Sequence, residues 1–588
     1  MHYLKNLKFI KNLRSLAKSI GRTEEPPEFL EKYNTIVDSA LRAHLKPEEV
    51  DTIINKYRRS PWNEDALKTD IERLDSDEHS VLKDEFYWQA IEHIKAEHFS
   101  PENLLQPVHF ADLRDYPWEL STSVGAPYAT SKHWQTYVEQ KYDMSQGNPG
   151  NKEFSFPEYR DLFAEAHKGQ SLEPTMVDAR MSKRNLYNEV FYINRTHVHL
   201  IKEGKTHNKA GHDLRYWNVA FARQHLVEAD EPDKVRLVFG APWLFLMVEM
   251  MFVWPIQAWL LRQGETSPLL WGYETLTGGW YRLRNYFSRI APRFITVLTL
   301  DWSGFDRYAR HTVIDDIHSK ILRPMFTFNH GYHPTRRNPD SKTQSWRLEN
   351  LWNWMTDAVK STPLMLPNGD LIEFKHSGIF SGYLQTQLLD SIYNLVMIYT
   401  ILFRLGFTKD QIRLKVQGDD SIIALLCVFI LVSPWLMNMI SHYAHLYFGA
   451  KLSEKKSELR KEFDHAEVLK YRNLNGLPYR DPIVLLAQLR HPERSHSLGV
   501  LKARAVGIAY ANCGSDPRVF KVCESIFQQL DSMGVKSSAK GLPDQIQFMN
   551  KFLRLKSPVD IERFPLYFET VKDLLNERAH MPTQAYWN

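Results

Sequence analysis

The heptapeptide Val416-Gln417-Gly418-Asp419-Asp420-Ser421-Ile422 decides how the rest of the sequence is interpreted. Two adjacent carboxylates lie between two apolar, β-prone runs, which span 412–416 and 422–432. A run, a turn and a second run predict a hairpin with its acids at the tip, and Gly418 permits a tight turn there. Because like charges at a turn repel each other, the pair favours a bound divalent cation such as Mg²⁺, which takes carboxylates together with substrate phosphates. A solvated Asp-Asp turn is the alternative.

The composition is that of a globular protein with several subdomains. A chain of 588 residues is too long for one compact core, and 43% hydrophobic and 24% charged residues are ordinary values. With 74 basic against 70 acidic residues, any basic surface for nucleic acid must be local, such as the lining of a channel. The three cysteines, Cys427, Cys513 and Cys523, have no metal-ligand spacing and indicate a reducing compartment without a disulfide framework.

Two apolar stretches raise the question of a membrane. Residues 242–261 contain Glu249 and Pro255 and are barely long enough to span a bilayer, and residues 422–432 are too short. We therefore predict a buried helix and a buried strand, and no transmembrane segment.

The first 22 residues predict a basic amphipathic helix. Cations and no acids accompany leucines and isoleucines at near-helical spacing, from Leu4 to Ile20. Such a helix could bind a membrane surface or target an organelle. We favour a helix packed on its own protein, because moderate amphipathicity is what any surface helix shows.

Several other segments carry polar side chains in fixed settings. The Gly and Pro of 123–127 predict a rigid loop whose hydroxyls can donate to phosphates, with a surface turn as the alternative. Lys234 and Arg236 alternate with apolar residues, so on a strand they share one face and suit a triphosphate, although edge strands also carry such cations. A charge run over 183–209, which begins with Lys183, could line a nucleic-acid path, with a solvated face as the default interpretation.

A second pair of acids follows a predicted buried strand at 294–300. The strand delivers Asp301 to its end, where ligands are usually held, and Asp306 lies beyond a glycine bend.

A helix from about residue 383 places Thr386, Asp390 and Asn394 on one face, at positions i, i+4 and i+8. Because its other faces are apolar, this polar stripe predicts a wet cavity rather than a solvent-facing surface. Asn-Gly dipeptides at 368–369 and 475–476 predict two hairpins.

Taken in order over 121–494, these segments resemble the viral RNA-dependent RNA polymerases. Residues 123–127 are similar to motif G, 234–236 to motif F, 301–306 to motif A, 381–394 to motif B, 418–420 to motif C, 451–457 to motif D and 471–479 to motif E. The wording of motifs A, B and C resembles partitivirus-type polymerases of double-stranded RNA viruses.

The resemblance implies an α+β right-hand polymerase with fingers, palm and thumb, closed fingers and a helical N-terminal extension. The predicted divisions are an N-terminal extension at 1–110, fingers at 111–294, motif A of the palm at 295–306, a fingers insertion at 307–375, palm at 376–481 and thumb at 482–588.

It also implies roles for site residues. Asp301 and Asp419 would hold two divalent cations, Mg²⁺ or alternatively Mn²⁺, with Asp420 as an auxiliary ligand. The incoming nucleotide would meet Lys234, Arg236, Asp306, Ser381, Gly382, Thr386, Asp390 and Asn394. Lys456 would protonate the pyrophosphate, with Lys455 and Lys451 as alternatives. Ser123, Gly125 and Pro127 would form the template-entrance loop.

Ribose recognition is a separate hypothesis, because Asp390 occupies a place where some relatives carry Asn. An ionised carboxylate only accepts hydrogen bonds, and Asp306 is already an acceptor. Asp390 is then protonated or turned away, or Asn394 or Ser381 senses the 2′-hydroxyl. We hypothesise that Asp306 and Ser381 discriminate the ribose, while Asp390 holds the motif B loop.

The implied function is template-directed RNA synthesis from ribonucleoside triphosphates, serving viral genome replication and transcription. The implied partners are RNA template, nascent strand and a capsid protein, for a monomer inside the virion or host cytoplasm. A reverse transcriptase is one alternative, disfavoured by Gln417 before Gly-Asp-Asp. A non-catalytic, capsid-associated RNA-binding scaffold is another, disfavoured because every acid that the chemistry needs is present.

Overall fold

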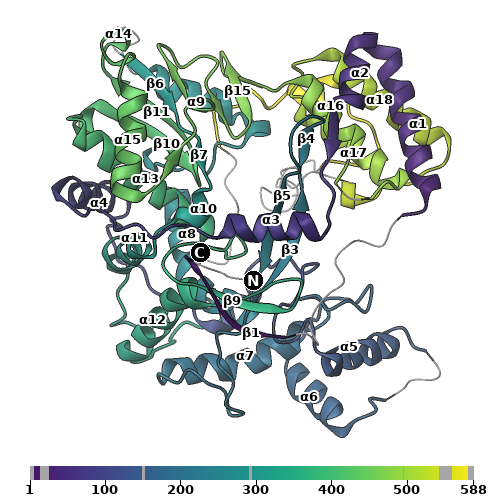
Figure 1. Cartoon of the computed structure of the whole chain (residues 1–588). Helices are drawn as coiled ribbons and strands as arrows, with labels where there is room; N and C mark the ends of the chain where they lie inside the picture. The colour runs from purple at the N-terminus through teal and green to yellow at the C-terminus, as the bar shows by residue number, and fades with distance from the viewer. Residues whose placement is uncertain are drawn as a thin grey trace.

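The computed structural model describes residues 5–13, 25–148, 153–289, 295–493, 495–541 and 559–579. Its elements form three groups (Figure 1). A small sheet with its helices lies at the upper left, a helical bundle at the upper right, and a five-stranded sheet with further helices below. Helices and strands are mixed along the chain, as an α+β fold requires.

The sheet at the upper left, here called the central sheet, has the strand order β10-β11-β6-β13. Its strands are β6 (Ile295–Thr299), β10 (Ile412–Gln417), β11 (Asp420–Leu426) and β13 (Glu458–Arg460). β10 and β11 form the predicted hairpin, in which Gln417 pairs with Asp420 and Gly418 adopts a positive φ of 57°. β11 runs antiparallel to β6 with Ile423 opposite Leu298. This register brings the start of β11 and the end of β6 to the same edge of the sheet.

The second apolar run of the hairpin is shorter as a strand than predicted. β11 ends at Leu426, and a short helix, α14 (Phe429–Val432), follows with Ile430 and Leu431 exposed. The prediction of a buried strand over 422–432 therefore holds only for its first half, in which β11 pairs with β10 and β6.

Two long apolar helices form the core beside the central sheet. They are α8 (Trp243–Arg262) and α13 (Thr386–Arg404). Among the described residues both are long and apolar enough to cross a membrane, but 83% and 94% of their most apolar windows are buried inside the protein. α4 (Glu85–His98) and α15 (Leu436–Phe448) pack against α13. The buried helix predicted for 242–261 is confirmed.

The lower sheet has the strand order β1-β9-β8-β3-β5. Its strands are β1 (Leu7–Asn12), β3 (Asn218–Gln224), β5 (Val235–Gly240), β8 (Leu364–Met365) and β9 (Asp370–Phe374). Helices α5 (Lys132–Ser145), α6 (Pro157–His167), α7 (Tyr187–Lys202) and α12 (Ser345–Ser361) belong to the same region. β8 and β9 confirm the hairpin predicted at the first Asn-Gly dipeptide.

The predicted N-terminal helix is wrong for its described part. Leu7–Asn12 forms strand β1, antiparallel to β9, and Asn12 donates to the Asp370 carboxylate over 2.6 Å. A free sheet edge offers the backbone a full set of hydrogen bonds, which outweighs the helical spacing of the leucines. Residues 14–22 of that prediction lie outside the described residues.

The bundle at the upper right, here called the terminal bundle, combines helices from both ends of the chain. Its helices are α1 (Pro27–His44), α2 (Pro47–Asn55), α16 (Pro482–Arg490), α17 (Leu498–Ala511) and α18 (Pro517–Ser532). Val37 and Leu41 of α1 share one apolar core with Leu501 and Val522. Helix α1 is therefore a structural part of this bundle.

The shared core predicts a difference between two leucines of α1. Leu41 is 0% exposed and Leu30 is 44% exposed. Leu41→Ala should lower the free energy of unfolding by about 2–5 kcal/mol, because it leaves a cavity in the core. Leu30→Ala should change it by less than about 0.5 kcal/mol. Unfolding in denaturant, with proteolysis of the bundle as the probe, measures both changes. Equal effects of the two variants would contradict the shared core.

Candidate active site

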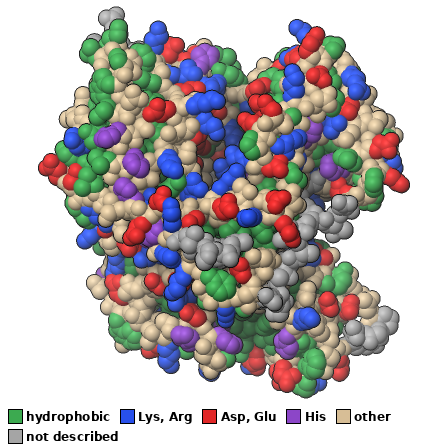
Figure 2. All heavy atoms as spheres, in the orientation of Figure 1, with side chains coloured by type: hydrophobic (Ala, Val, Ile, Leu, Met, Phe, Trp, Pro, Cys, Tyr) green, Lys and Arg blue, Asp and Glu red, His purple; other side chains and the backbone are tan. Residues whose placement is uncertain are grey.

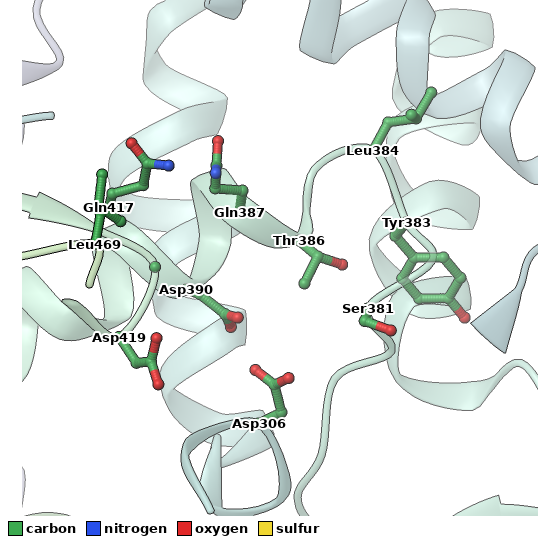
Figure 3. A pocket seen from close by; sticks show the side chains of 11 residues that line it. Asp306, Ser381, Tyr383, Leu384, Thr386, Gln387, Asp390, Gln417, Asp419 and Leu469 are labelled. Atoms are coloured by element: carbon green, nitrogen blue, oxygen red, sulfur yellow. The ribbon is translucent and has the colours of Figure 1, made fainter. Parts of the chain in front are cut away.

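Five aspartates from separate elements converge at one edge of the central sheet. Asp301 follows β6, Asp419 and Asp420 lie at the hairpin tip, Asp306 opens α10 (Phe305–Tyr308), and Asp390 projects from α13. Figure 3 shows the carboxylates of Asp306, Asp390 and Asp419 directed toward one space. The segment after β12 (Lys451–Leu452) restrains the backbone of Asp301. The Ser453 amide donates to the Asp301 carbonyl over 2.8 Å, and the Asp301 amide donates to Ser457 Oγ over 2.9 Å. The three predicted metal ligands are thus brought together.

The electrostatics of this cluster resist ionisation. Burial, together with the charges of Asp419 and Asp301, raises the pKa of Asp420 to about 7. Burial and the Asp306 charge raise the pKa of Asp419, while Arg236 opposes the rise. Like charges held together in a partly buried site destabilise their ionised forms. A donor set of carboxylate oxygens under this strain fits a hard divalent cation such as Mg²⁺.

A cavity of about 550 Å³ adjoins the acids. It is lined by Asp306, Ser381, Tyr383, Leu384, Thr386, Gln387, Asp390, Gln417, Gly418, Asp419 and Leu469. The wet cavity predicted from the polar stripe of the helix is therefore present, with Thr386 and Asp390 on its wall.

Asp306 and Asp390 form a hydrogen-bonded pair of carboxyl groups in this cavity. Asp390 is only 8% exposed. Burial, followed by the charge and hydrogen bond of Asp306, raises the pKa of Asp390 well above its usual range. In its protonated form Asp390 can donate to Asp306, which leaves lone pairs of Asp306 open toward the cavity.

Helix α13 holds the hairpin tip from below. The amide of Gly418 donates to Ser391 Oγ over 2.8 Å, and Asn394 Nδ2 donates to the Gly418 carbonyl over 3.0 Å. Trp302 Nε1 donates to Asn394 Oδ1 over 3.0 Å. The prediction that Asn394 contacts the nucleotide needs correction, because both ends of its buried amide bond protein groups. Ser391 was missed, since a helical Ser that bonds the carbonyl four residues back carries no special pattern.

The motif B loop is held at two further points. A Cβ on Gly382 would lie 1.8 Å from the Phe239 carbonyl oxygen of β5, so only glycine fits there. Glu249 of α8, wholly buried, accepts from the amide of Leu384 over 2.7 Å and from Gln385 Nε2 over 2.8 Å. Burial raises the pKa of Glu249 to about 8. The sequence showed Glu249 only as an acid inside an apolar run and gave no sign of its partners.

Cations face the acids across the site. Figure 2 shows Lys and Arg side chains gathered in the hollow between the upper left and upper right of the molecule. Arg236 acts electrostatically on Asp419, and Lys470 on Asp420, while Lys456 and Lys470 both act on Lys234. Lys234 and Arg236 of motif F and Lys456 of motif D thus lie near the cluster.

Lys470 was missed as a site residue. It lies with Leu469 in the turn between β14 (Glu467–Val468) and β15 (Tyr471–Leu474), where both adopt a positive φ of 66° and 52°. A turn without glycine leaves little trace in the sequence, whereas the adjoining hairpin of β15 and β16 (Leu477–Tyr479) was predicted from Asn-Gly and is confirmed.

A glycine in a tight space and a buried lysine restrain the predicted template-entrance loop. Gly125 has a φ of 76°, and a Cβ there would lie 2.6 Å from the Ala241 carbonyl oxygen. Lys183 Nζ donates to Thr122 Oγ1 over 2.7 Å and to the Ser123 carbonyl over 2.9 Å. Lys183 is buried, which lowers its pKa to about 8. It therefore braces this loop and is not part of the solvated face predicted for 183–209. The loop ends at Pro127, after a cis Ala126–Pro127 peptide bond.

Comparison with known proteins decides the family. A model of the family described as "Viral RNA-dependent RNA polymerase" matches residues 177–526, more than half of the chain. The chain belongs to the viral RNA-dependent RNA polymerases. It is 31% identical to the RNA-directed RNA polymerase of White clover cryptic virus 1 over 552 residues, which cover 89% of this chain and 87% of that protein. The same-named protein of Atkinsonella hypoxylon virus is 26% identical over 469 residues, 72% of this chain and 64% of its own length.

The fold agrees with this assignment. The Sicinivirus 3Dpol RNA dependent RNA polymerase superposes with a TM-score of 0.59 at 13% identity, covering 93% of this chain and 99% of that chain. The prediction of an α+β right-hand polymerase is confirmed, and so is the partitivirus-like resemblance. The protein is an RNA-dependent nucleotidyltransferase rather than a reverse transcriptase, and it therefore binds RNA and ribonucleoside triphosphates.

The raised pKa of Asp420 predicts how the polymerase binds divalent cations as pH changes. If Asp420 is one of the ligands, the ion would bind its ionised carboxyl, and because the folded pKa is about 7, each pH unit below 7 should then weaken binding by up to about tenfold. Above pH 7 the affinity should level off. Calorimetric titration with Mg²⁺ at pH 6 to 8, in buffers of different ionisation enthalpy, measures both the affinity and the proton released. Asp420→Asn should lower the proton release, and an unchanged release would reassign the pKa to another group.

Proposed function

We propose that the polymerase makes RNA by metal-assisted nucleotidyl transfer at the aspartate cluster. Asp301 and Asp419 would hold two divalent cations, Mg²⁺ with Mn²⁺ as the alternative, and Asp420 would support them. When bound, the ions would lower the pKa of the attacking 3′-hydroxyl, neutralise charge on the leaving pyrophosphate and align the two for in-line displacement. The observation that supports this best is the convergence of the acids opposite Arg236 and Lys470.

The chain's own side chains would bind and orient the nucleotide. Arg236 can take phosphate oxygens in a bidentate fork, and Lys234 adds a point charge to the same group. Lys456 is exposed and close enough to act on Lys234, which suits a proton donor to the pyrophosphate. The motif G loop of Ser123 and Gly125, braced by Lys183, would guide the template strand.

Ribose recognition would depend on the Asp306–Asp390 pair. With Asp390 protonated and donating to it, Asp306 remains an acceptor for the 2′-hydroxyl. Ser381 lies across the same cavity, where its hydroxyl can bond the ribose. Thr386 donates to the Phe380 carbonyl and would shape the loop rather than contact the sugar.

Loss of one metal ligand tests the catalytic assignment. Asp419→Ala should lower incorporation of labelled ribonucleotides on a single-stranded RNA template by at least about a thousandfold, because several kcal/mol of charge stabilisation is lost. Binding of the template should persist. Asp410→Asn, an exposed acid before β10, is the matched control and should retain full activity. Unchanged synthesis in Asp419→Ala would support the non-catalytic scaffold instead.

Ribose choice tests the acid pair. Asp306→Ala should lower the preference for ribo- over deoxynucleotides by about tenfold or more, because the cavity loses its acceptor for the 2′-hydroxyl. Asp390→Asn should keep the preference within about threefold, since its amide can still donate to Asp306. Competition between the two nucleotide types in primer extension measures this. No change in Asp306→Ala together with a collapse in Asp390→Ala would refute the assignment.

The biological setting follows from the resemblance to its relatives. We propose roles in viral genome replication and transcription, inside the virion or the host cytoplasm, with a capsid protein as partner of a monomeric polymerase. Relatives with RNA-directed RNA polymerase names from two viruses support the viral setting.

A further inference from the structure

Helix α3 (Glu64–Leu74) lies across the front of the molecule, between the lower sheet and the central sheet (Figure 1). Asn63 caps its first turn by accepting from the Ala66 amide over 2.8 Å. Its buried residues are Ala66, Leu67, Asp70 and Ile71, which form one face. Asp70 therefore occupies an apolar face with only 6% of its surface exposed. A buried carboxyl needs hydrogen-bond donors, and its position on α3 points to what those donors are.

The donor is a backbone amide of the motif F strand. Leu237 N donates to Asp70 Oδ2 over 2.7 Å, and α3 packs against β5. Within the described part of the chain, β5 is an edge strand, because it pairs with β3 alone in the five-stranded sheet. An edge strand exposes every second amide without a partner. Asp70 supplies that partner next to Arg236.

This bond restrains the direction of the Arg236 side chain. Val235 and Leu237 are buried whereas Arg236 is exposed, as the alternation of a strand requires. Arg236 therefore leaves β5 on the face opposite to Leu237 and acts on Asp419. Twisting or sliding the edge strand would move Arg236 away from the aspartate cluster.

The segment before α3 restrains the same strand at its other end. Ser60 Oγ, wholly buried, accepts from the Lys234 amide over 2.8 Å. β2 (Tyr57–Arg59) pairs antiparallel with β4 (Leu226–Glu228), just before motif F. Residues 57–74, here called the strap, thus contact motif F on both sides of Arg236.

The strap also contacts motif A. Arg307, which follows Asp306, donates through Nη1 to the Arg73 carbonyl over 2.7 Å at the end of α3. The charges that act on Asp70 come from Arg73, Arg236 and Arg307. One short helix therefore joins the strand that carries the triphosphate-binding cation to the loop that carries the motif A acids.

We propose that Asp70 is a positioning residue, which fixes Arg236 for binding the triphosphate by holding the edge amide of Leu237. This rests on the proposed role of Arg236. Helix α3, which lies far from motif F in the sequence, would thereby support nucleotide binding. Asp70 acts through the strand and does not touch the nucleotide.

Substitutions of Asp70 separate positioning from charge. Asp70→Ala removes the acceptor and should raise KM for ribonucleoside triphosphates about tenfold, with kcat within about twofold, because binding is lost without a change in chemistry. Asp70→Asn keeps an acceptor oxygen for the Leu237 amide and should restore KM to within about twofold of the unaltered enzyme. Steady-state synthesis on a primed homopolymer RNA template, in the full-length chain, gives both constants.

Two controls make every outcome informative. Glu72→Gln changes an exposed acid of the same helix and should leave both constants unchanged. Arg236→Ala tests the underlying assignment and should raise KM at least as much as Asp70→Ala. If Arg236→Ala leaves KM unchanged, the proposed role of Arg236 fails.

Other results would overturn the positioning role alone. If Arg236→Ala raises KM while Asp70→Ala does not, Asp70 does not position it. If Asp70→Asn behaves like Asp70→Ala, the negative charge and not the hydrogen bond is what matters. A fall in melting temperature and in the active fraction, at unchanged KM, would show that Asp70 serves stability only.

Discussion

Repulsion among the aspartates at one edge of the central sheet is the constraint that the rest of the structure must meet. The register of β11 on β6 places the start of β11 beside the end of β6, so Asp301 and the hairpin tip lie close together. Burial makes this proximity more unfavourable, as the raised pKa of Asp420 shows. A cluster of this kind is tolerated only where positive charge balances it, from bound metal ions or from cationic side chains. The protein supplies such side chains from motif F and from the turn at Lys470.

Loops around the cluster are held by one recurring device. A titratable side chain, buried in apolar surroundings, bonds the backbone of a functional segment. Glu249 holds the motif B loop, Lys183 holds the motif G loop, and Asp70 holds the motif F strand. Because a buried polar or charged group without a partner is costly, each such contact resists any displacement of its loop. The site thereby gains rigidity from residues that do not face the nucleotide.

Sequence reasoning reached the parts of the site that local pattern determines. The hairpin tip, the strand before Asp301 and the face shared by Thr386 and Asp390 follow from periodicities of two and 3.6 residues. Asn394 was assigned to the nucleotide because periodicity identifies a helix face without saying what covers it. The strand at Leu7–Asn12 was taken for a helix because its partner, β9, lies more than 350 residues away.

The bracing residues stayed hidden for a related reason. Glu249 bonds an amide 135 residues further along the chain, and Asp70 bonds one 167 residues further. A backbone amide is the same in every residue, so nothing in the sequence marks it as a partner. Likewise, Lys470 adopts a positive φ without being glycine, and tertiary packing alone enforces that conformation.

The mixed origin of the terminal bundle has a consequence for synthesis of the chain on the ribosome. Helix α1 emerges among the first fifty residues, but α18, against which it packs, ends at Ser532. Until α18 has been synthesised, the apolar face of α1 therefore has α2 but not its full set of native partners. At about 5–20 residues per second this interval lasts on the order of half a minute to two minutes. Over that interval chaperones or transient contacts would shield this face, and the bundle closes only after α18 has been made.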